Sequence, residues 1–442
     1  MAKNLVKSLI SSNLVAEKQN ISDMKKKPLD QLTEVIADAF NGTAKVRKNF
    51  RNLIIETIIL YMCIPKRINF TQMARYGVSC ESRFRQNFSK RFDWVAFNSS
   101  FTDKMQGHRT AIAIDPSFIK KSGKQTPGIG YYWSGCANAV MRGLEILDIA
   151  LVDADAKDAV HLKAVQTVDI KKVGRPPKYL EGMDEPNSLI AWYLRALACE
   201  QESLQKLSNI VVADAFFSKF TFANGLQCLG FELVSRFRND VSLQYLYNGQ
   251  PTGRKGRPKK FDGRVNLKEL REDVFNEETY DYPDGGTMIL HSAVVWATSL
   301  KRNVRVVIVD CPEKGKKTQT RKIFFSTDVN MQPKDIMDIY RTRFQIEFLI
   351  RDAKQFTGLC HCQSRKKEKL NFAFNCSLTA INVAREFARR HGDGLSVAGV
   401  KTLMHNAMML ELFFKKSGHK PNKLLNTNDF KELLYYGVAD AA

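Results

Sequence analysis

The amino-acid sequence predicts an α/β protein in which a mixed-sheet core is interrupted by a β-rich insertion and flanked by helical N- and C-terminal regions. Three observations lead to this prediction. Apolar, β-branched segments between residues 110 and 152 have the length and spacing of three meander strands. Residues 187–237 alternate helical and strand-like segments, which is typical of a mixed sheet. Helical patterns dominate residues 1–105 and the C-terminal end of the chain.

The composition indicates a globular protein with a polyanionic partner. The chain has 442 residues, of which 44% are hydrophobic and 26% are charged, as in ordinary globular proteins. Its formal net charge is +22, and so large a charge repels itself in a compact fold. Nucleic acid is the first partner to consider. An anionic membrane surface is the second, but the chain has no long basic amphipathic helix with aromatic residues opposite the charges.

Targeting and redox features favour the cytoplasm. No apolar run approaches the roughly 18 residues that a membrane-spanning helix needs. The N-terminus lacks the uninterrupted apolar stretch of a signal peptide, so we expect a cytoplasmic protein with no membrane partner. The nine cysteines are scattered and odd in number, which argues against a disulfide framework. Cys360, His361 and Cys362 are too close together in sequence for a tetrahedral zinc site.

The N-terminal region carries the outline of a helix-turn-helix. Pro28 marks one helix start, and residues 51–62 predict a second, more buried helix. Residues 69–92 then predict a short helix, a turn at Gly77 and a second helix after Ser79. We expect the second helix to present side chains suited to phosphates and base edges: Ser82, Arg83, Arg85, Gln86, Lys90 and Arg91. A helical bundle with a basic surface is the alternative, but the charge of residues 1–110, 19 Lys and Arg against 9 Asp and Glu, favours DNA contact.

The core is predicted to begin with a strand at residues 110–119 that carries Asp115 to its tip. A buried strand at residues 209–214 ends in a second acid, Asp214. The other predicted core elements are strands at 128–136, 142–152 and 231–237 and helices at 187–207 and 219–229. We place the first part of the core at residues 106–238 and its last part, with a further helix, at residues 329–380.

Residues 239–328 form the predicted insertion. It contains a basic Gly/Pro segment and then short alternating strands, which we place at 287–298, 304–309 and 322–326. Beyond the core, the C-terminal region at 381–442 completes a helical part of the chain. Its predicted helices, the first of which begins within the core, lie at 370–390, 397–415 and 429–436.

Residues 336–354 are the stretch around which the rest is organised. The segment has no Pro or Gly and is predicted to be one helix, with six apolar positions toward a core: Ile336, Ile339, Ile346, Leu349, Ile350 and Ala353. Steps of three, four and seven residues bring five polar side chains to one face: Tyr340, Arg343, Glu347, Arg351 and Lys354. A carboxylate among cations suits work on a phosphodiester, because it can hold a metal while the cations hold phosphate oxygens. A solvated face with an ordinary Glu347–Arg351 pair is the alternative.

Three acids can converge at one edge of the sheet: Asp115, Asp214 and Glu347. Three carboxylates in a polar cleft can hold two divalent ions about 3.5–4 Å apart, as in two-metal phosphoryl-transfer sites. Hard oxygen ligands suit magnesium. Asp310 and Asp153 show the same strand-end pattern, and spacing does not exclude either of them.

A family resemblance decides between these alternatives. The segments IAIDPSFI and VVADAFFSK, with the pattern Tyr340-x2-Arg343-x3-Glu347-x6-Lys354, resemble the DDE transposases of bacterial insertion sequences. They are similar to the group named for its Tyr-Arg-Glu-Lys signature, and all four signature positions match. The resemblance spans about residues 105–380.

The resemblance implies an RNase H-like catalytic core with a β-rich insertion between the second and third acids. It implies that Asp115, Asp214 and Glu347 bind two Mg²⁺ ions, for which Mn²⁺ is expected to substitute. By analogy, Tyr340, Arg343 and Lys354 contact DNA phosphates near the cleaved end. Arg351 shares their predicted helix face and is expected to contact DNA with them. The implied activity is cut-and-paste transposition: cleavage at the terminal inverted repeats, then joining of the 3'-hydroxyl to target DNA. The implied setting is a bacterial nucleoid, with a homodimer in the DNA complex.

Three further features bear on DNA contact. Members of this group that flip a base fill the gap with a Trp from the insertion; Trp296 is the candidate, although core packing suits its apolar neighbours better. The Gly-Arg-Pro segments resemble an AT-hook without the preceding Arg, and we expect phosphate contact from their cations: Arg175, Lys178, Arg257 and Lys259. The alternatives to a transposase are a related nuclease or resolvase, which would cut without joining, and a non-catalytic DNA-binding derivative.

Overall fold

The structure is a computed structural model and describes residues 27–167, 188–250, 258–281, 287–312, 319–391, 394–418 and 427–439. The chain divides into two compact units. One comprises residues 1–101, 125–127 and 350–442, and the other comprises residues 102–124 and 128–349. The second unit contains the sheet, and we call it the sheet unit; we call the first the helical unit.

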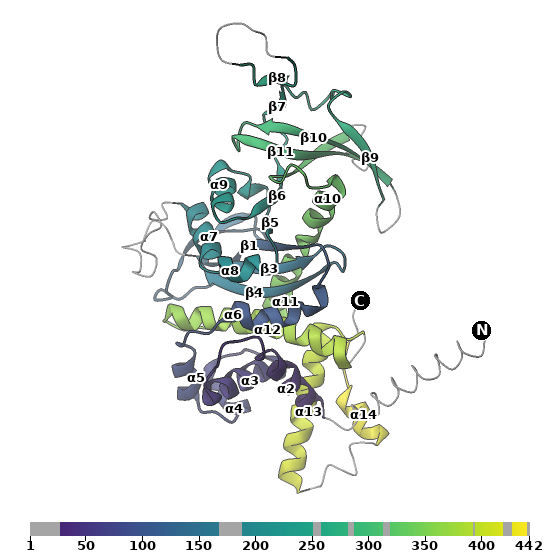
Figure 1. The fold of residues 1–442 in the computed structure, drawn as a ribbon. Coiled ribbons are helices and arrows are strands. Elements are labelled where there is room, and N and C mark those ends of the chain that lie inside the picture. The colour runs from purple at the N-terminus through teal and green to yellow at the C-terminus, as the bar shows by residue number, and fades with distance from the viewer. Residues whose placement is uncertain are drawn as a thin grey trace, which may run out of the picture. The chain divides into compact units, whose positions relative to one another are not determined.

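The sheet unit is built on one mixed sheet, to which the described residues contribute twelve strands (Figure 1). Its path runs β2-β3-β1-β5-β6-β12-β11-β10-β7-β8, with β4 paired to β3 and β9 to β10. The strands are β1 Thr110–Lys120, β2 Gly130–Ser134, β3 Ala139–Asp153, β4 Asp158–Gln166, β5 Ile210–Val212, β6 Glu232–Phe237, β7 Leu243–Leu246, β8 Phe261–Arg264, β9 Asn276–Asp281, β10 Thr287–Ala297, β11 Arg302–Pro312 and β12 Gln319–Ser326.

The centre of the sheet is parallel and its outer parts are antiparallel. β1 pairs in parallel with β5, and β5 with β6, whereas β3 runs antiparallel to β1. β12 pairs antiparallel with β6, so the strands from the predicted insertion continue the core sheet and do not form a sheet of their own. The limits of the insertion at residues 239–328 stay a prediction.

The helices of the sheet unit follow the chain between its strands. They are α7 Leu189–Ala198, α8 Gln201–Gln205, the short 3-10 helix η4 Ala215–Phe217, α9 Phe220–Cys228 and α10 Pro333–Thr342, while η1 Ser100–Met105 and α11 Phe344–Gln355 extend into the helical unit. The prediction of a single helix at residues 187–207 is wrong, because the helix is interrupted between α7 and α8. There the carboxylate of Glu200 binds Lys163 of β4, a tertiary contact that local propensity does not register.

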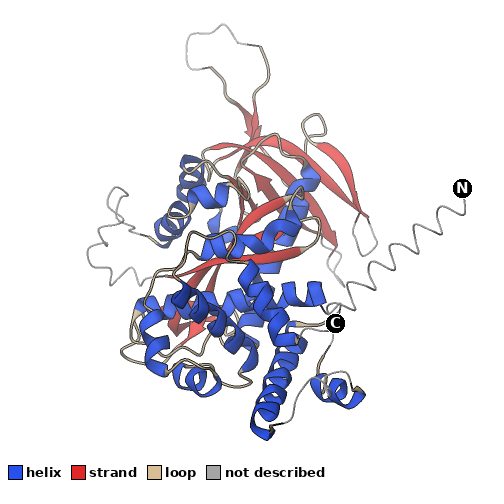
Figure 2. Cartoon of the chain, turned by 60° about the horizontal axis from the view of Figure 1, so that its bottom comes forward, coloured by secondary structure: helices blue, strands red, loops and turns tan. Residues whose placement is uncertain are grey.

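The described residues of the helical unit contain helices and connecting loops (Figure 2). Besides the ends of η1 and α11, its helices are α2 Pro28–Asp38, α3 Lys48–Cys63, α4 Phe70–Tyr76, α5 Glu81–Asn87, α6 Trp94–Ser99, α12 Lys367–His391, α13 Val397–Ser417 and α14 Asn428–Leu434. The 25-residue helix α12 is buried along most of its length and packs against α2, α3 and α13. Pro28 occupies the first turn of α2, as predicted.

Several strands escape the sequence-based prediction. The predicted strands overlap eight observed ones, β1, β2, β3, β5, β6, β10, β11 and β12, whereas β4, β7, β8 and β9 were not predicted. β4 alternates apolar residues with His161 and Lys163, as a strand does, but it begins at the end of the acid-rich segment 153–158, which is typical of a turn. Eight residue pairs join β4 to β3, and this pairing, which cannot be read from the local sequence, stabilises the strand.

The stretch predicted as one helix at residues 336–354 is two helices. α10 ends at Thr342 and α11 begins at Phe344, with Arg343 between them. The backbone of Arg343 stays in the right-handed helical region, and the N–H of Ile346 donates to its C=O three residues back, so the junction is a short 3-10-type tightening. The core-facing positions predicted from the periodicity are confirmed, since all six are buried: Ile336, Ile339, Ile346, Leu349, Ile350 and Ala353.

Candidate active site

Two of the three candidate acids lie at the same level on neighbouring parallel strands. Ile112 of β1 pairs with Val211 of β5, and Ala113 with Val212, after which β5 ends. The same offset along the chain aligns Asp115 with Asp214, both just beyond the end of the parallel pairing. The prediction that Asp115 lies at the tip of its strand is wrong. β1 continues to Lys120, because it stays paired with the antiparallel strand β3.

Local hydrogen bonds fix the backbone around Asp214. The side chain caps η4, and its Oδ1 accepts from the N–H of Phe216 at 3.0 Å. The backbone carbonyl of Asp214 accepts from Ser235 Oγ of β6 at 2.9 Å. A short buried strand followed by an Asx-type cap therefore leaves one carboxylate oxygen outside this hydrogen bond, at the end of the parallel strands.

The third acid, Glu347 of α11, forms an ion pair with the residue between α10 and α11. Arg343 Nη2 lies 2.9 Å from Glu347 Oε1, one helical turn away. The guanidinium of Arg343 is almost buried, with its side chain 10% exposed, and it lies 5.9 Å from the ring centre of Tyr340. Burial alone would lower the pKa of Arg343, but Glu347, Tyr340 and Asp115 reverse that effect and raise it. The cation is therefore held in a negative environment.

The pKa of Asp115 depends on its burial and on the charges near it. Burial raises the pKa of Asp115 to about 8, and the carboxylates of Glu347, Asp214 and Asp148 add to this, whereas the guanidinium of Arg343 opposes it. Asp115 thus lies within electrostatic range of both other candidate acids. The structure gathers Asp115, Asp214, Glu347 and Arg343 in one region of the sheet unit.

The donor set suits magnesium, although the side chains are not closed around a metal position. Three carboxylates offer hard oxygen ligands. Burial is the main cause of the raised pKa of Asp115, and the charges of Glu347 and Asp214 add to it, so a cation would relieve the repulsion between them. Within the described ranges, no group of three His, Cys, Asp or Glu side chains is arranged to hold a metal ion. In this arrangement one carboxylate oxygen of Glu347 pairs with the guanidinium of Arg343.

Three further polar residues of the stretch 336–354 were predicted to contact DNA: Tyr340, Arg351 and Lys354. Tyr340 is half-buried and packs on Phe324 of β12, with ring centres 4.9 Å apart. Arg351 and Lys354 lie one and two turns beyond Glu347 on α11, in the part of that helix that belongs to the helical unit. Arg351 is exposed, and its Nη2 lies 3.3 Å from the neighbouring Asp352. Roles for these three residues stay predictions.

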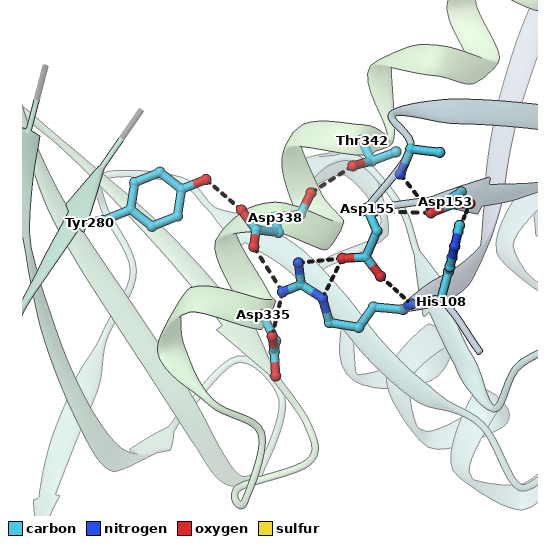
Figure 3. A network of polar contacts seen from close by, with 9 residues as sticks. His108, Asp153, Asp155, Tyr280, Asp335, Asp338 and Thr342 are labelled. Carbon is cyan, nitrogen blue, oxygen red and sulfur yellow. Dashed lines mark hydrogen bonds and ion pairs between the residues drawn. The ribbon is translucent and has the colours of Figure 1, made fainter. Parts of the chain in front are cut away.

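A polar network that sequence reasoning missed holds α10 (Figure 3). Arg109, just before β1, donates to Asp155 of the β3–β4 turn and, through Nη1, to Asp335 and Asp338 of α10 at 2.6 and 2.8 Å. The hydroxyl of Tyr280 on β9 donates to the other oxygen of Asp338. Figure 3 shows Asp335 and Asp338 on successive turns of the helix. The helix that leads to Arg343 is therefore fastened both to the core strands and to β9.

A buried pair beside Asp115 was also missed. Asp148 of β3 is directly opposite Asp115 of β1, and its Oδ1 shares a 2.6 Å hydrogen bond with His161 Nδ1 of β4. Both side chains are fully buried, and burial raises the pKa of Asp148 although His161 opposes the shift. A strand alternation that places Asp148 on the inward face was the available signal, but its partner strand β4 was not predicted.

In the helical unit, α4, the turn at Gly77 and α5 give the predicted helix-turn-helix outline. Glu56 of α3 holds the turn by accepting from the N–H groups of Val78 and Ser79 at 2.7 and 2.8 Å. All six candidate contact residues are exposed: Ser82, Arg83, Arg85, Gln86, Lys90 and Arg91. Arg85 also pairs with Glu81 at 2.5 Å, so part of its charge is already balanced. α5 ends at Asn87, which leaves Lys90 and Arg91 beyond the helix.

The two competing acids have structural partners. Asp310 of β11 accepts from Arg321 Nε of β12 at 2.7 Å. Asp153 is fully buried and accepts from two N–H groups of the β3–β4 turn and contacts His108 Nδ1 at 2.6 Å. These contacts account for both acids without a metal.

Of the remaining candidates, Trp296 packs in the β-rich region. Its ring lies 5.3 Å from that of Phe261, and it is half-buried, as its apolar neighbours suggested. Lys259 pairs with Asp262 at 2.7 Å and lies over the ring of Tyr247. Arg175, Lys178 and Arg257 lie outside the described residues.

Comparisons with known proteins bear on this site. A family model described as a transposase DDE domain matches residues 197–383, and one described as a DDE superfamily endonuclease matches residues 62–274. Asp115 and Asp214 fall in the second match, and Asp214 and Glu347 in the first. No curated protein matches the chain. None of the described helices is long and apolar enough to cross a membrane. The mixed α/β structure with its large sheet suits an RNase H-like endonuclease, and the two family matches support a DDE-superfamily transposase, a nuclease of the transposase type.

Proposed function

We propose that this chain is a cut-and-paste DNA transposase of the Tyr-Arg-Glu-Lys group. It binds the terminal inverted repeats of its insertion sequence, cleaves the ends by metal-dependent hydrolysis and joins the 3'-hydroxyl to target DNA. The observation that carries the proposal is the alignment of Asp115 with Asp214 at the end of the parallel strands. Glu347 and Arg343 also lie near enough to affect the pKa of Asp115. The two competing acids, Asp310 and Asp153, have structural partners, which also favours this triad.

The carboxylates of Asp115, Asp214 and Glu347 would hold two Mg²⁺ or Mn²⁺ ions. When bound, these ions supply charge stabilisation to the attacking and leaving oxygens of the phosphodiester. Arg343 balances the carboxylates in the free protein through its pair with Glu347. In the DNA complex its guanidinium can turn to a phosphate oxygen, because a bidentate cation suits that geometry. Tyr340, Arg351 and Lys354 are proposed to hold the DNA backbone beside the cleaved bond.

DNA contact is assigned to three parts of the chain. The exposed cations around α5, Arg83, Arg85 and Lys90, suit the recognition of the element ends. The cations of the Gly-Arg-Pro segments add phosphate contacts, and Trp296 is kept as the residue that fills the gap left by a flipped base. Because two ends must be brought together, a homodimer is the proposed state in the DNA complex, in association with the nucleoid.

The experiment that tests this function is cleavage of a labelled duplex whose sequence comes from the DNA at either side of the gene. With Mg²⁺ or Mn²⁺, the wild type should cut at the element end and join the product to a plasmid. Glu347→Ala should lose at least about a hundred-fold in cleavage rate while still binding the duplex. Asp310→Asn is the matched control, because Asp310 shows the same sequence pattern but binds Arg321.

Each other outcome favours a different protein. Cleavage without joining indicates a related nuclease or resolvase, and binding without cleavage indicates a non-catalytic DNA-binding derivative. If Glu347→Ala still cuts, Glu347 is no metal ligand and the triad proposed here is wrong. Light scattering of the DNA complex tests the dimer independently of the chemistry.

A further inference from the structure

The hairpin of β2 and the start of β3 presents an exposed aromatic face. Tyr131 and Trp133 alternate with buried residues along β2, and their side chains are 74% and 57% exposed. Across the hairpin they pair with Arg142 and with Val140, which is itself 61% exposed. Residues directly opposite on antiparallel strands share a face, so these four side chains form one surface, the hairpin face.

The charged side chains of the hairpin and of the segment that leads into it are all positive. Residues 116–144 contain Lys120, Lys121, Lys124 and Arg142 and neither Asp nor Glu. Arg142 is exposed, and its Nη1 donates to the carbonyl of Ser122 at 3.0 Å, which holds the guanidinium beside the aromatic pair. Exposed aromatic rings beside a fixed cation suit contact with the sugars and phosphates of a nucleic acid.

The hairpin face lies on the same side of the sheet as the catalytic candidate Asp115. Asp115 is opposite Asp148, and Val140 is eight residues from Asp148 along the same strand β3, an even separation. Alternation therefore puts Val140, and its partner Trp133, on the Asp115 side. Eight residues of strand span about 26 Å. Leu144 and Ile146, which share this side, are buried, so the hairpin face is a separate footprint and not an extension of the site.

We propose that the hairpin face binds the DNA duplex about eight base pairs from the phosphate that lies at Asp115. That separation converts the span of about 26 Å at roughly 3.4 Å per base pair. Tyr131 and Trp133 contact sugars and base edges, and Arg142 contacts a phosphate, without reading sequence. The inference rests on the proposed function for the position of the cleaved bond.

The test combines binding with mapping of contacts. Trp133→Ala and Tyr131→Ala should each weaken binding of a fluorescent duplex about ten-fold, because the apolar contact of one ring with the sugars and base edges is lost. Trp133→Phe, which keeps a ring, should bind nearly as well as the wild type. Ile289→Ala is the control: it removes exposed apolar surface from β10, outside the hairpin face, and binding should be unchanged.

Cross-link mapping shows whether the hairpin face holds DNA of the element or DNA that flanks it. A photoreactive p-benzoylphenylalanine placed at position 133 should cross-link about five to ten base pairs from the cleaved bond, on the element side or on the flanking side. Either side supports the proposal and identifies the segment held. If the wild type binds and cuts but Trp133→Ala binds equally well and position 133 cross-links nothing, the hairpin face is not a DNA contact. A wild type that neither binds nor cuts DNA instead contradicts the proposed function itself.

Discussion

Arg343 and Glu347 are joined by a 2.9 Å ion pair that spans the junction between α10 and α11. The pair brings a cation into the group of carboxylates that includes Asp115, and the guanidinium acts there as a built-in counter-charge. A divalent ion at the same carboxylates would compete with it. The free protein thus carries a positive charge beside these acids.

Removing this counter-charge should strengthen the response to divalent ions. In Arg343→Met the carboxylates repel one another without compensation, so Mn²⁺ should raise the melting temperature by about 2 °C more than it does in the wild type. Thermal scans with and without Mn²⁺ measure this without any cleavage assay. Glu347→Gln should show a smaller shift than the wild type. Equal shifts in Arg343→Met and wild type would mean that the guanidinium and the metal do not compete.

Asp115 should make the metal-free protein less stable as the pH rises. Its pKa is raised to about 8 in the fold, against about 3.9 in the unfolded chain, so folding favours its protonated form. The resulting stability is fully present below about pH 4 and is lost as the pH rises toward 8. Asp115→Asn removes this dependence. With a chelator present, the variant should melt about 2 °C or more above the wild type at pH 8 and alike at pH 4. A variant that melts lower at pH 8 contradicts the assignment.

The Arg109 network should behave as one unit. Arg109→Met leaves Asp155, Asp335 and Asp338 close together without their cation, and we expect a loss of about 1–2 kcal/mol in the free energy of unfolding. Denaturant titration of Arg109→Met, Asp338→Asn and the double variant gives the coupling energy. The double variant should lose less than the sum of the two single ones. Strict additivity would show that Arg109 does not hold α10 through Asp338.

The turn between α4 and α5 should tolerate only glycine at residue 77. A Cβ there would lie 2.6 Å from Glu56 Oε1 and 2.8 Å from the carbonyl oxygen of Met73. Gly77→Ala should therefore destabilise the protein by about 1–3 kcal/mol and weaken DNA binding through α5. Gly135→Ala is the control for stability, because an added Cβ there meets nothing within 4 Å. Chemical denaturation and DNA titration of both variants measure the two effects.

The sequence predicts those parts of the fold that depend on local periodicity. The apolar positions of residues 336–354 are buried as expected, and most helices fall within a few residues of their predicted bounds. Sequence could not place Asp115 along its strand, because the length of β1 is set by β3, its distant partner. The strand β4 was missed for the same reason.

In the candidate site, too, contacts between residues close in sequence can be predicted, and contacts between distant residues cannot. Glu347 and Arg343 are four residues apart on a helical stretch, so their proximity follows from spacing. The contacts of Arg109 and of Asp148 join residues that are 13 to 229 positions apart, and no local pattern carries them. What the sequence lacks is therefore the set of long-range partners that hold the acids in place.

The pairing of β12 with β6 decides how far the β-rich region can be treated as a detachable part. Four residue pairs join these strands, and on its other side β6 pairs with β5. Excising the strands from β7 to β12 would leave β6 with a bare row of backbone donors and acceptors beside the parallel centre. Such an edge recruits strands from other molecules, so a shortened chain should aggregate during expression. An exchange of this region between related proteins needs to keep a strand in the position of β12.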